Sequence, residues 1–455
     1  MRASAAGAAW AATAGAIPAE SPRPKGPNII FILADDLGYG DLGCYGQKVI
    51  QTPRIDRMAA EGLRFTQCYA GSTVCAPSRC CLMTGLHSGH AWIRGNARLP
   101  LRPEDVTVAE VMKEAGYTTG LIGKWGLGNE ETTGTPNKQG FDEFFGYLDQ
   151  KHAHNYYPEY LWRNEEKVRL EGNIEEKPEV SSERVQYTPD LFTEEALSFV
   201  TRHREHPFFL YLAYTIPHAN NERGGAKGDG METPSYAPYE DKDWPTPQKG
   251  HAAMVTRLDR DVGRVLDKVA ELGLDNDTLI FFSSDNGPHQ EGGGDPEFFD
   301  SSGPLRGLKR DLYEGGIRVP MIARWPGKVP AGTTSDLVLA FWDFLPTAAQ
   351  IASVVPPEGL DGHTVVPELV GRHDAQPEHD YLYWEFYERG FSQAARQGNW
   401  KAVRPKAGEP TELYDLSADL GEAKNVAGDH PDIATRLESL FQQAHVPSPH
   451  WQPKT

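Results

Sequence analysis

Three continuous runs of apolar residues constrain the fold more than any other feature of the sequence. They cover residues 28–34, 207–213 and 278–284. None alternates between polar and apolar residues, so each predicts a strand that is buried on both faces of a parallel sheet. An apolar stripe at helical spacing over residues 251–274 predicts a helix that packs on this sheet. We therefore expect an α/β fold, with a large mixed, mostly parallel sheet sandwiched by helices.

The sequence changes character at about residue 372. Short alternating segments at 381–386, 391–395 and 400–404 predict a smaller antiparallel sheet. A helix over about 431–445 would lie against it. We expect a main catalytic domain over residues 25–371 and a C-terminal α+β subdomain over residues 372–455.

The first 24 residues predict a signal or leader segment. Residues 8–16 are almost all small or apolar, and Arg2 is the one basic residue before Arg23. We therefore expect export to the periplasm or the exterior, and the alternative is a cytoplasmic chain with an Ala-rich N-terminus. No later run approaches the ~18 consecutive apolar residues of a membrane span, so none is predicted.

Composition limits the partners. The formal charge of −19 argues against nucleic acid or an anionic membrane as a general partner, but it does not exclude a small anionic substrate. Besides Cys75, the cysteines stand at positions 44, 68, 80 and 81, without metal-type spacing or an evident disulfide framework.

Polar residues follow the predicted strands. Asp35 and Asp36 come directly after the first run, and Asp285 and Asn286 follow the run at 278–284. The carboxyl ends of parallel strands share one crevice, where these four side chains offer oxygen ligands suited to Ca²⁺ or, alternatively, Mg²⁺. The competing interpretation is a set of ordinary solvated turns, in which Asp and Gly are common.

The segment from residue 75 to residue 85 reads CAPSRCCLMTG. Pro77 suits the first turn of a helix, which places Cys75 just before a helix N-terminus that favours a nucleophile or an anion. Arg79 follows about one turn later and can point back to the same end. Taken alone, Cys75 favours the ordinary interpretation of a buried thiol beside a helix start.

The whole segment resembles the signature C-x-P-S-R-x-x-L-x-T-G of the sulfatases, which belong to the alkaline phosphatase superfamily. The resemblance extends from about residue 28 into the C-terminal subdomain. It implies that a maturation enzyme oxidises Cys75 to formylglycine, the nucleophile of these sulfuric ester hydrolases. It also implies that a calcium ion is held by Asp35, Asp36, Asp285 and Asn286, with residue 75 among its ligands.

The same resemblance assigns roles to four further residues. Arg79 would stabilise the formylglycine, and Lys124, His218 and Lys309 would contact the sulfate. His218 or Lys309 would assist the departing ester oxygen. One hydroxyl of the hydrated aldehyde would attack sulfur, and the other would later expel sulfate as the aldehyde re-forms. A covalent step of this kind divides one difficult displacement into two.

One position departs from the family pattern. After Lys124-Trp125 sulfatases usually carry a histidine, and here Gly126 stands in its place. Either His152, His154 or His289 replaces that imidazole near Cys75, or the turnover step is slowed. We expect these three histidines to contribute to substrate binding.

The expected substrate is a sulfated small molecule or glycan. The aromatic residues between positions 141 and 162 favour a sulfated sugar over a simple aryl sulfate as the substrate, and the alternative role for them is core packing under a long loop. Two alternatives stay open. One is a phosphonate or phosphodiester hydrolase of the same superfamily, and the other is a non-catalytic protein that binds sulfated sugars.

Overall fold

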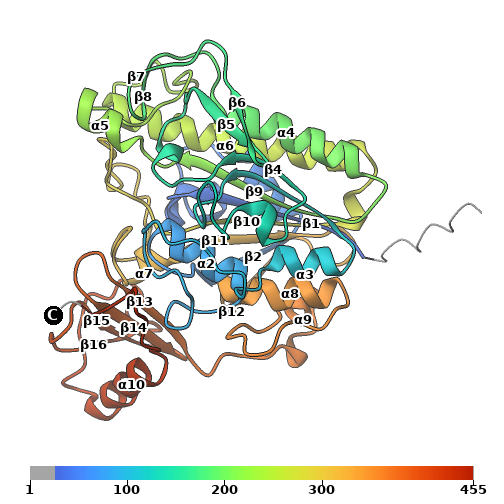
Figure 1. The fold of residues 1–455 in the computed structure, drawn as a ribbon. Coiled ribbons are helices and arrows are strands. Elements are labelled where there is room, and N and C mark those ends of the chain that lie inside the picture. Colours follow the sequence, from blue (N-terminus) through green and yellow to red (C-terminus); the bar gives the residue numbers. More distant parts are fainter. Residues whose placement is uncertain (1–25, 454–455) are drawn as a thin grey trace, which may run out of the picture.

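The structure is a computed structural model that describes residues 26–453. Within these residues, ten strands form one sheet in the order β12-β2-β11-β10-β1-β9-β3-β4-β5-β6 (Figure 1). The bounds are β1 Asn28–Asp35, β2 Leu63–Tyr69, β3 Thr118–Lys124, β4 Glu143–Tyr147, β5 Tyr160–Arg163, β6 Glu166–Arg169, β9 Phe208–Pro217, β10 Thr278–Ser284, β11 Arg318–Arg324 and β12 Thr333–Ala340. The central strands β10, β1, β9, β3 and β4 run parallel, as does the β12–β2 pair. The predicted mixed, mostly parallel sheet is confirmed.

The three apolar runs form the centre of this sheet. Every residue of β1, β9 and β10 is buried. In β1, Ile30 and Ile32 belong to the core on one face, whereas Phe31 and Leu33 belong to the core on the other. Phe31 is in register with Tyr211 of β9 and Phe281 of β10. Both faces are apolar, because both are covered by helices.

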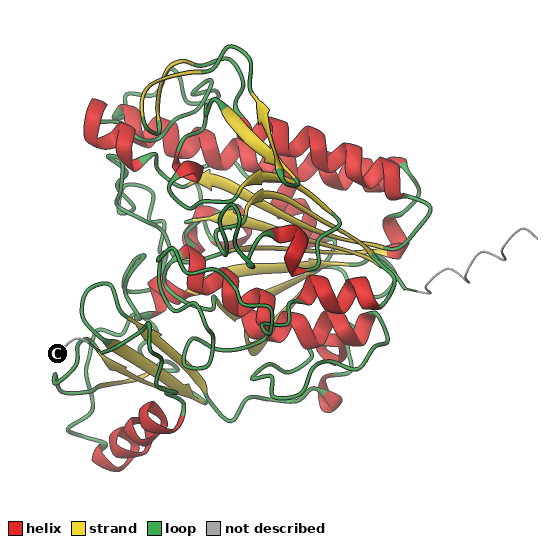
Figure 2. Cartoon of the chain, viewed as in Figure 1, coloured by secondary structure: helices red, strands yellow, loops and turns green. Residues whose placement is uncertain are grey.

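Helices cover both faces of the sheet (Figures 1 and 2). One layer contains α1 (Pro53–Ala60), α4 (Thr188–His203) and α6 (Thr246–Glu271). The opposite layer contains α2 (Cys75–Thr84), α3 (Val108–Glu114) and α8 (Phe344–Ile351). The predicted sandwich is thus confirmed. Helix α6 begins five residues before the predicted start, because Pro247 lies in its first turn, where a missing N–H group is tolerated.

A separate four-stranded antiparallel sheet follows, as predicted. It contains β13 (Leu382–Phe386), β14 (Ser392–Gln397), β15 (Trp400–Arg404) and β16 (Glu412–Asp415), and α10 (Pro431–Gln443) packs on it. The domain boundary at residue 372 stays a prediction.

Some short elements were absent from the sequence prediction. Residues 129–190 contain β4, β5 and β6 together with the hairpin of β7 (Ile174–Lys177) and β8 (Val180–Glu183), and the predicted long loop at 219–250 contains α5 (Asn221–Lys227). All four residues of β6 are exposed, so no hydrophobic pattern marks this strand. The remaining short helices are α7 (Glu314–Ile317) and α9 (Val366–Leu369).

Two predictions concern the membrane and the leader. In the described part of the chain, no helix combines the length and the apolar character needed to cross a bilayer. The predicted leader, residues 1–24, lies outside the described residues.

Candidate active site

Cys75 is the first residue of α2 rather than the residue before the helix, and its side chain is buried. Its Sγ donates to Asp35 Oδ1 over 3.5 Å. Burial, reinforced by the charge of Asp35, raises the pKa of the Cys75 thiol. An unmodified thiol here is therefore a poor nucleophile, because the thiolate is the reactive form.

Strand order brings the acidic residues together. Because β1 and β10 are adjacent and parallel, their carboxyl ends lie side by side, and the Asp285 N–H donates to the Ala34 carbonyl at 3.1 Å. The Asp36 N–H in turn donates to Asp285 Oδ1 at 3.1 Å. Asp36 has a φ of +66°, a strained conformation for a residue other than glycine, of the kind that clusters at functional sites.

Asn286 completes this group with an oxygen that has no partner. Its Nδ2 donates to Asp36 Oδ1 at 2.7 Å and to the Gly287 carbonyl at 2.9 Å, which fixes the orientation of the amide. Within residues 26–453, the buried Asn286 Oδ1 accepts no hydrogen bond. An unsatisfied buried acceptor costs about 1–3 kcal/mol, and a cation ligated through oxygen would satisfy it. The donor set therefore fits Ca²⁺ or Mg²⁺.

Arg79 ties the acidic group to the next strand. Its Nε and Nη2 donate to Asp285 Oδ2 at 3.0 and 2.8 Å, and its Nη1 donates to the Lys124 carbonyl at 2.7 Å. Nη2 also lies 3.3 Å from Asp35 Oδ2. The guanidinium is fully buried, so each of these contacts is shielded from water.

Two buried lysines face the two adjacent carboxylates. Lys124 Nζ donates to Asp35 Oδ2 at 2.7 Å, and Lys309 Nζ donates to Asp36 Oδ2 at 2.8 Å. Burial alone raises the pKa of Asp35 and Asp36. The combined charges of the surrounding cationic groups, led by Lys124 at Asp35 and by Lys309 at Asp36, outweigh this effect and hold both pKa values below their usual range.

His218 lies against Lys309. Its Nδ1 donates to the Ala219 carbonyl at 2.6 Å, which leaves Nε2 to accept from Lys309 Nζ at 3.1 Å. Burial and the nearby Lys309 charge lower the pKa of His218, so the imidazole is neutral.

Glu291 also belongs to this group, although the sequence analysis did not identify it. Its Oε2 lies 3.2 Å from Lys309 Nζ, and its Oε1 accepts from Arg310 at 2.5 Å. The sequence carries no signal for this contact, because Glu291 reaches Lys309 from a loop that shows no periodicity.

The side chain of Gln150 fills the place above Gly126, and the replacement of the missing imidazole by one of the three histidines stays a prediction. Gly126 has a φ of +80°, and a Cβ built there would lie 2.2 Å from Gln150 Nε2. The three nearest atoms are all from the Gln150 side chain. Gln150 Nε2 is buried and has no hydrogen-bond partner in the described residues.

The three candidate histidines lie in different surroundings. His154 stacks on His218 with ring centroids 4.8 Å apart, and its Nδ1 lies 2.9 Å from Glu222 Oε2. His289 has both ring nitrogens engaged, Nδ1 by the Glu291 N–H and Nε2 by the Pro217 carbonyl. His152 packs on Tyr160 at 4.5 Å and lines a pocket farther along the surface.

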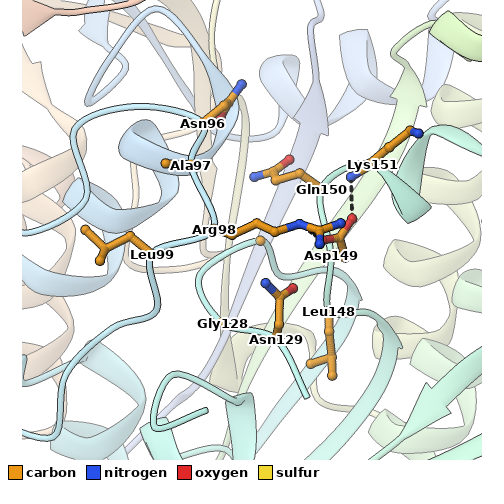
Figure 3. Close-up of a pocket in the computed structure, with 11 residues that line it drawn as sticks. Asn96, Ala97, Arg98, Leu99, Gly128, Asn129, Leu148, Asp149, Gln150 and Lys151 are labelled. Atoms are coloured by element: carbon orange, nitrogen blue, oxygen red, sulfur yellow. Dashed lines mark hydrogen bonds and ion pairs between the residues drawn. The ribbon is translucent and has the colours of Figure 1, made fainter. Parts of the chain in front are cut away.

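A pocket extends from Gly126 (Figure 3). Its walls include Asn96, Arg98, Gln150 and Lys151. Asn96 Oδ1 accepts from the Ala76 N–H at 3.0 Å, so this pocket adjoins the start of α2. Figure 3 shows the Gln150 amide extending toward the loop that carries Asn96.

Comparison with known proteins agrees with this geometry. The family model described as Sulfatase matches residues 27–354, and the model described as N-sulphoglucosamine sulphohydrolase, C-terminal, matches residues 307–445. The chain is 32% identical over 459 residues to N-acetylgalactosamine-6-sulfatase of Sus scrofa, covering 93% of this chain and 81% of that protein. It is 33% identical over 474 residues to arylsulfatase A of Homo sapiens, covering 91% and 87%.

A solved structure shows the same architecture. The crystal structure of Ps i-CgsB in complex with k-i-k-neocarrahexaose superposes with a TM-score of 0.80 at 28% identity, covering 95% of this chain and 96% of that chain. Together with the family model, which spans more than half of the sequence, these matches establish that the chain belongs to the sulfatase family and is a sulfuric ester hydrolase.

Proposed function

We propose that this chain hydrolyses sulfate esters of a carbohydrate, with a formylglycine made from Cys75 as nucleophile and a bound calcium ion. One observation carries the proposal. Two buried lysines, each paired with one carboxylate of the Asp35–Asp36 pair, lie in the same cluster as the Cys75 side chain. Buried cations in such a cluster suit a substrate whose charge shifts among sulfate oxygens.

Asp35, Asp36, Asp285 and Asn286 would hold the calcium ion, and the unsatisfied Asn286 Oδ1 supports this assignment. The cation would act as a Lewis acid toward a sulfate oxygen and would offset the crowded carboxylates. Magnesium is the alternative ion.

The formylglycine would supply a hydrated aldehyde that attacks sulfur. Arg79 would keep residue 75 in position, because its guanidinium is fixed by Asp285 and by the Lys124 carbonyl. Lys124 and Lys309 would neutralise sulfate oxygens. Lys309 Nζ donates a hydrogen bond to His218 Nε2. We infer that this pair supplies the proton to the departing ester oxygen.

A carbohydrate substrate is supported by the relatives and by the site. One relative is named an N-acetylgalactosamine-6-sulfatase, and one similar structure contains a neocarrahexaose. In this chain Tyr160 and Trp162 line the same pocket as His152. Aromatic side chains with polar tips suit sugar rings. His152, His154 and His289 stay candidates for substrate contacts.

The proposal includes two further steps. The chain is exported to the periplasm or the exterior, and a formylglycine-generating enzyme modifies Cys75. The Ala-rich first 24 residues and the matched signature at Cys75 support these two steps.

The nucleophile is tested by Cys75→Ala. We expect hydrolysis of a sulfated N-acetylhexosamine to fall to background, with the melting temperature preserved, because alanine is well tolerated at a helix start. Cys80→Ala is the matched control, since Cys80 is buried in the same helix outside the acidic cluster. Peptide mass spectrometry of the active wild-type protein should find residue 75 as the aldehyde. A fully active Cys75→Ala protein would refute the mechanism.

Parallel assays on an aryl sulfate and the matching aryl phosphate separate the sulfatase from the phosphoryl hydrolase. We expect the larger kcat/KM with the sulfate. Turnover of either ester excludes the non-catalytic binding protein.

A further inference from the structure

The pocket beside Gly126 continues into a second pocket, and together they form a groove that leads away from residue 75. The inner pocket contains Gln150 and has a volume of about 190 Å³. The outer pocket, of about 340 Å³, contains His152, and that volume lies within the range of small-molecule sites. The two share the residues Arg98, Asn129, Leu148 and Asp149. One extended ligand can therefore occupy both.

Residues that line this groove carry buried polar atoms without partners. They are Gln150 Nε2 in the inner pocket, and His152 Nε2 and Glu179 Oε2 in the outer pocket. None of the three has a hydrogen-bond partner within residues 26–453. Each unsatisfied atom costs about 1–3 kcal/mol, so a ligand that supplies hydrogen bonds is favoured.

Hydroxyl groups match these atoms better than anions do. Burial lowers the pKa of His152 to about 4, so its ring is neutral at physiological pH and gives an anion no ion pair. Gln150 is uncharged. A hydroxyl group both donates and accepts, and it can satisfy an amide, an imidazole or a carboxylate.

The outer pocket is acidic. The carboxylates of Glu130, Asp149, Glu175 and Glu179 line it. Among the described residues that line this pocket, Arg98 is the single cationic side chain, and it is largely exposed and lies 3.6 Å from Asp149. Burial and the charge of Glu175 raise the pKa of Glu179 to about 7, as expected where carboxylates crowd together.

The carboxylate of Glu175 and the backbone of Glu179 are each held by an asparagine. Glu175 Oε1 accepts from Asn155 Nδ2 at 2.8 Å. Glu179 stands at the turn between β7 and β8 with a φ of +62°, and its carbonyl accepts from Asn220 Nδ2 at 2.9 Å. The position of Glu179 in the lining of the outer pocket is therefore set by its backbone.

We infer that the groove binds the sugar next to the sulfated unit and selects an uncharged sugar over one that bears a carboxylate or a second sulfate. The inference rests on the proposed function, because it assumes a sulfated glycan at residue 75. Above about pH 7, where Glu179 is ionised, Glu175 and Glu179 would repel an anionic neighbour, and Gln150 and His152 would contact the hydroxyl groups of a neutral one.

The test compares two disaccharides. Both carry the same sulfated N-acetylhexosamine, joined in one case to a neutral hexose and in the other to the corresponding hexuronic acid. For the wild-type enzyme we expect kcat/KM to favour the neutral disaccharide by roughly tenfold or more, since like charges placed together are strongly disfavoured. The paired variant Glu175→Gln/Glu179→Gln keeps the side-chain shapes and should reduce this ratio to roughly threefold or less.

The matched control is Glu176→Gln/Glu183→Gln. It removes two charges from the same hairpin, at exposed positions outside the lining of the outer pocket. We expect the ratio to keep its wild-type value. Melting temperatures of both paired variants confirm folding.

The outcomes are distinct. Equal use of the two disaccharides, or a preference for the uronic acid, overturns the inference while sulfatase activity stands. An unchanged ratio in Glu175→Gln/Glu179→Gln, or an equal reduction in the control, also overturns it. If neither disaccharide nor the sulfated monosaccharide is hydrolysed by protein with residue 75 in the aldehyde form, the proposed function itself fails.

Discussion

The residues at positions 126 and 150 compete for the same space. A side chain at position 126 and the present Gln150 amide cannot occupy the same space, because a Cβ at 126 would lie 2.2 Å from Nε2. The φ of +80° at Gly126 adds a backbone constraint, although histidine tolerates this region better than most residues do. In this chain a side chain at position 126 therefore requires Gln150 to move or to be replaced.

This pairing predicts non-additive stability. Gly126→His should destabilise the fold by about 1–3 kcal/mol through overpacking. Adding Gln150→Ala should recover at least about 1 kcal/mol of that loss, because it removes the atoms that clash. Urea unfolding of the two single variants and the double variant measures the coupling. Strict additivity would show that the two side chains do not compete.

We expect calcium binding at the acidic group to depend on Asn286. Wild-type protein should retain about one calcium ion per chain after dialysis, and Asn286→Ala should retain less, with lower activity and a lower melting temperature, because one ligand is gone. The exposed Asn276→Ala is the control. Elemental analysis that finds equal calcium in all three proteins would exclude Asn286 as a ligand.

At the scale of elements, the site is built where strands end and one helix begins. Asn96 caps α2 from outside, through the Ala76 N–H, whereas α3 is capped by its own Thr107, which accepts from the Glu110 N–H at 3.3 Å. The first cap adjoins residue 75 and the groove. The second lies in a helix that contributes no residue to the acidic cluster.

These two caps predict different effects. Asn96→Ala and Thr107→Ala should each lower the free energy of unfolding by about 0.5–2 kcal/mol. Only Asn96→Ala should also lower kcat, because it loosens the helix turn that positions residue 75. Chemical unfolding and steady-state kinetics on both variants make the comparison. An equal loss of kcat in Thr107→Ala would mean that general stability, and not local positioning, limits turnover.

Some of this site could be predicted from sequence and some could not. The runs that lead to Asp35–Asp36 and Asp285–Asn286 are buried on both faces, so the hydrophobic pattern predicts central parallel strands whose carboxyl ends share one edge. That these two strands are direct neighbours is seen only in the structure. Gln150 reaches Gly126 from a loop, and Glu291 reaches Lys309 from another. No periodicity encodes either contact, because both depend on how long loops fold back over the sheet.

At the scale of the whole molecule, a buried ionic network joins the two sheets. Lys401 on β15 lies 2.9 Å from Glu314 Oε1 on α7 and 2.9 Å from Glu422 Oε1, and all three side chains are fully buried. Glu314 also accepts from Tyr69 of β2 at 2.7 Å. Burial raises the pKa of Glu314, but the charges of Lys401 and Arg318 outweigh this effect and hold it at about 2.

Removing Lys401 should therefore weaken the contact between the two sheets and lower the free energy of unfolding. Lys401→Met keeps the stem of the side chain but leaves two buried carboxylates facing each other, and we expect a loss of about 3–5 kcal/mol in the free energy of unfolding. Adding Glu422→Gln should recover part of the loss, since Glu314 keeps Arg318 Nη1 at 3.1 Å and the charge of Glu422 is the one left without a cationic partner within residues 26–453. The exposed Lys406→Met, on the loop after β15, should change stability by less than about 0.5 kcal/mol. Urea unfolding compares the variants. Loss of less than 1 kcal/mol in Lys401→Met would show that apolar packing alone holds the C-terminal sheet against the main one.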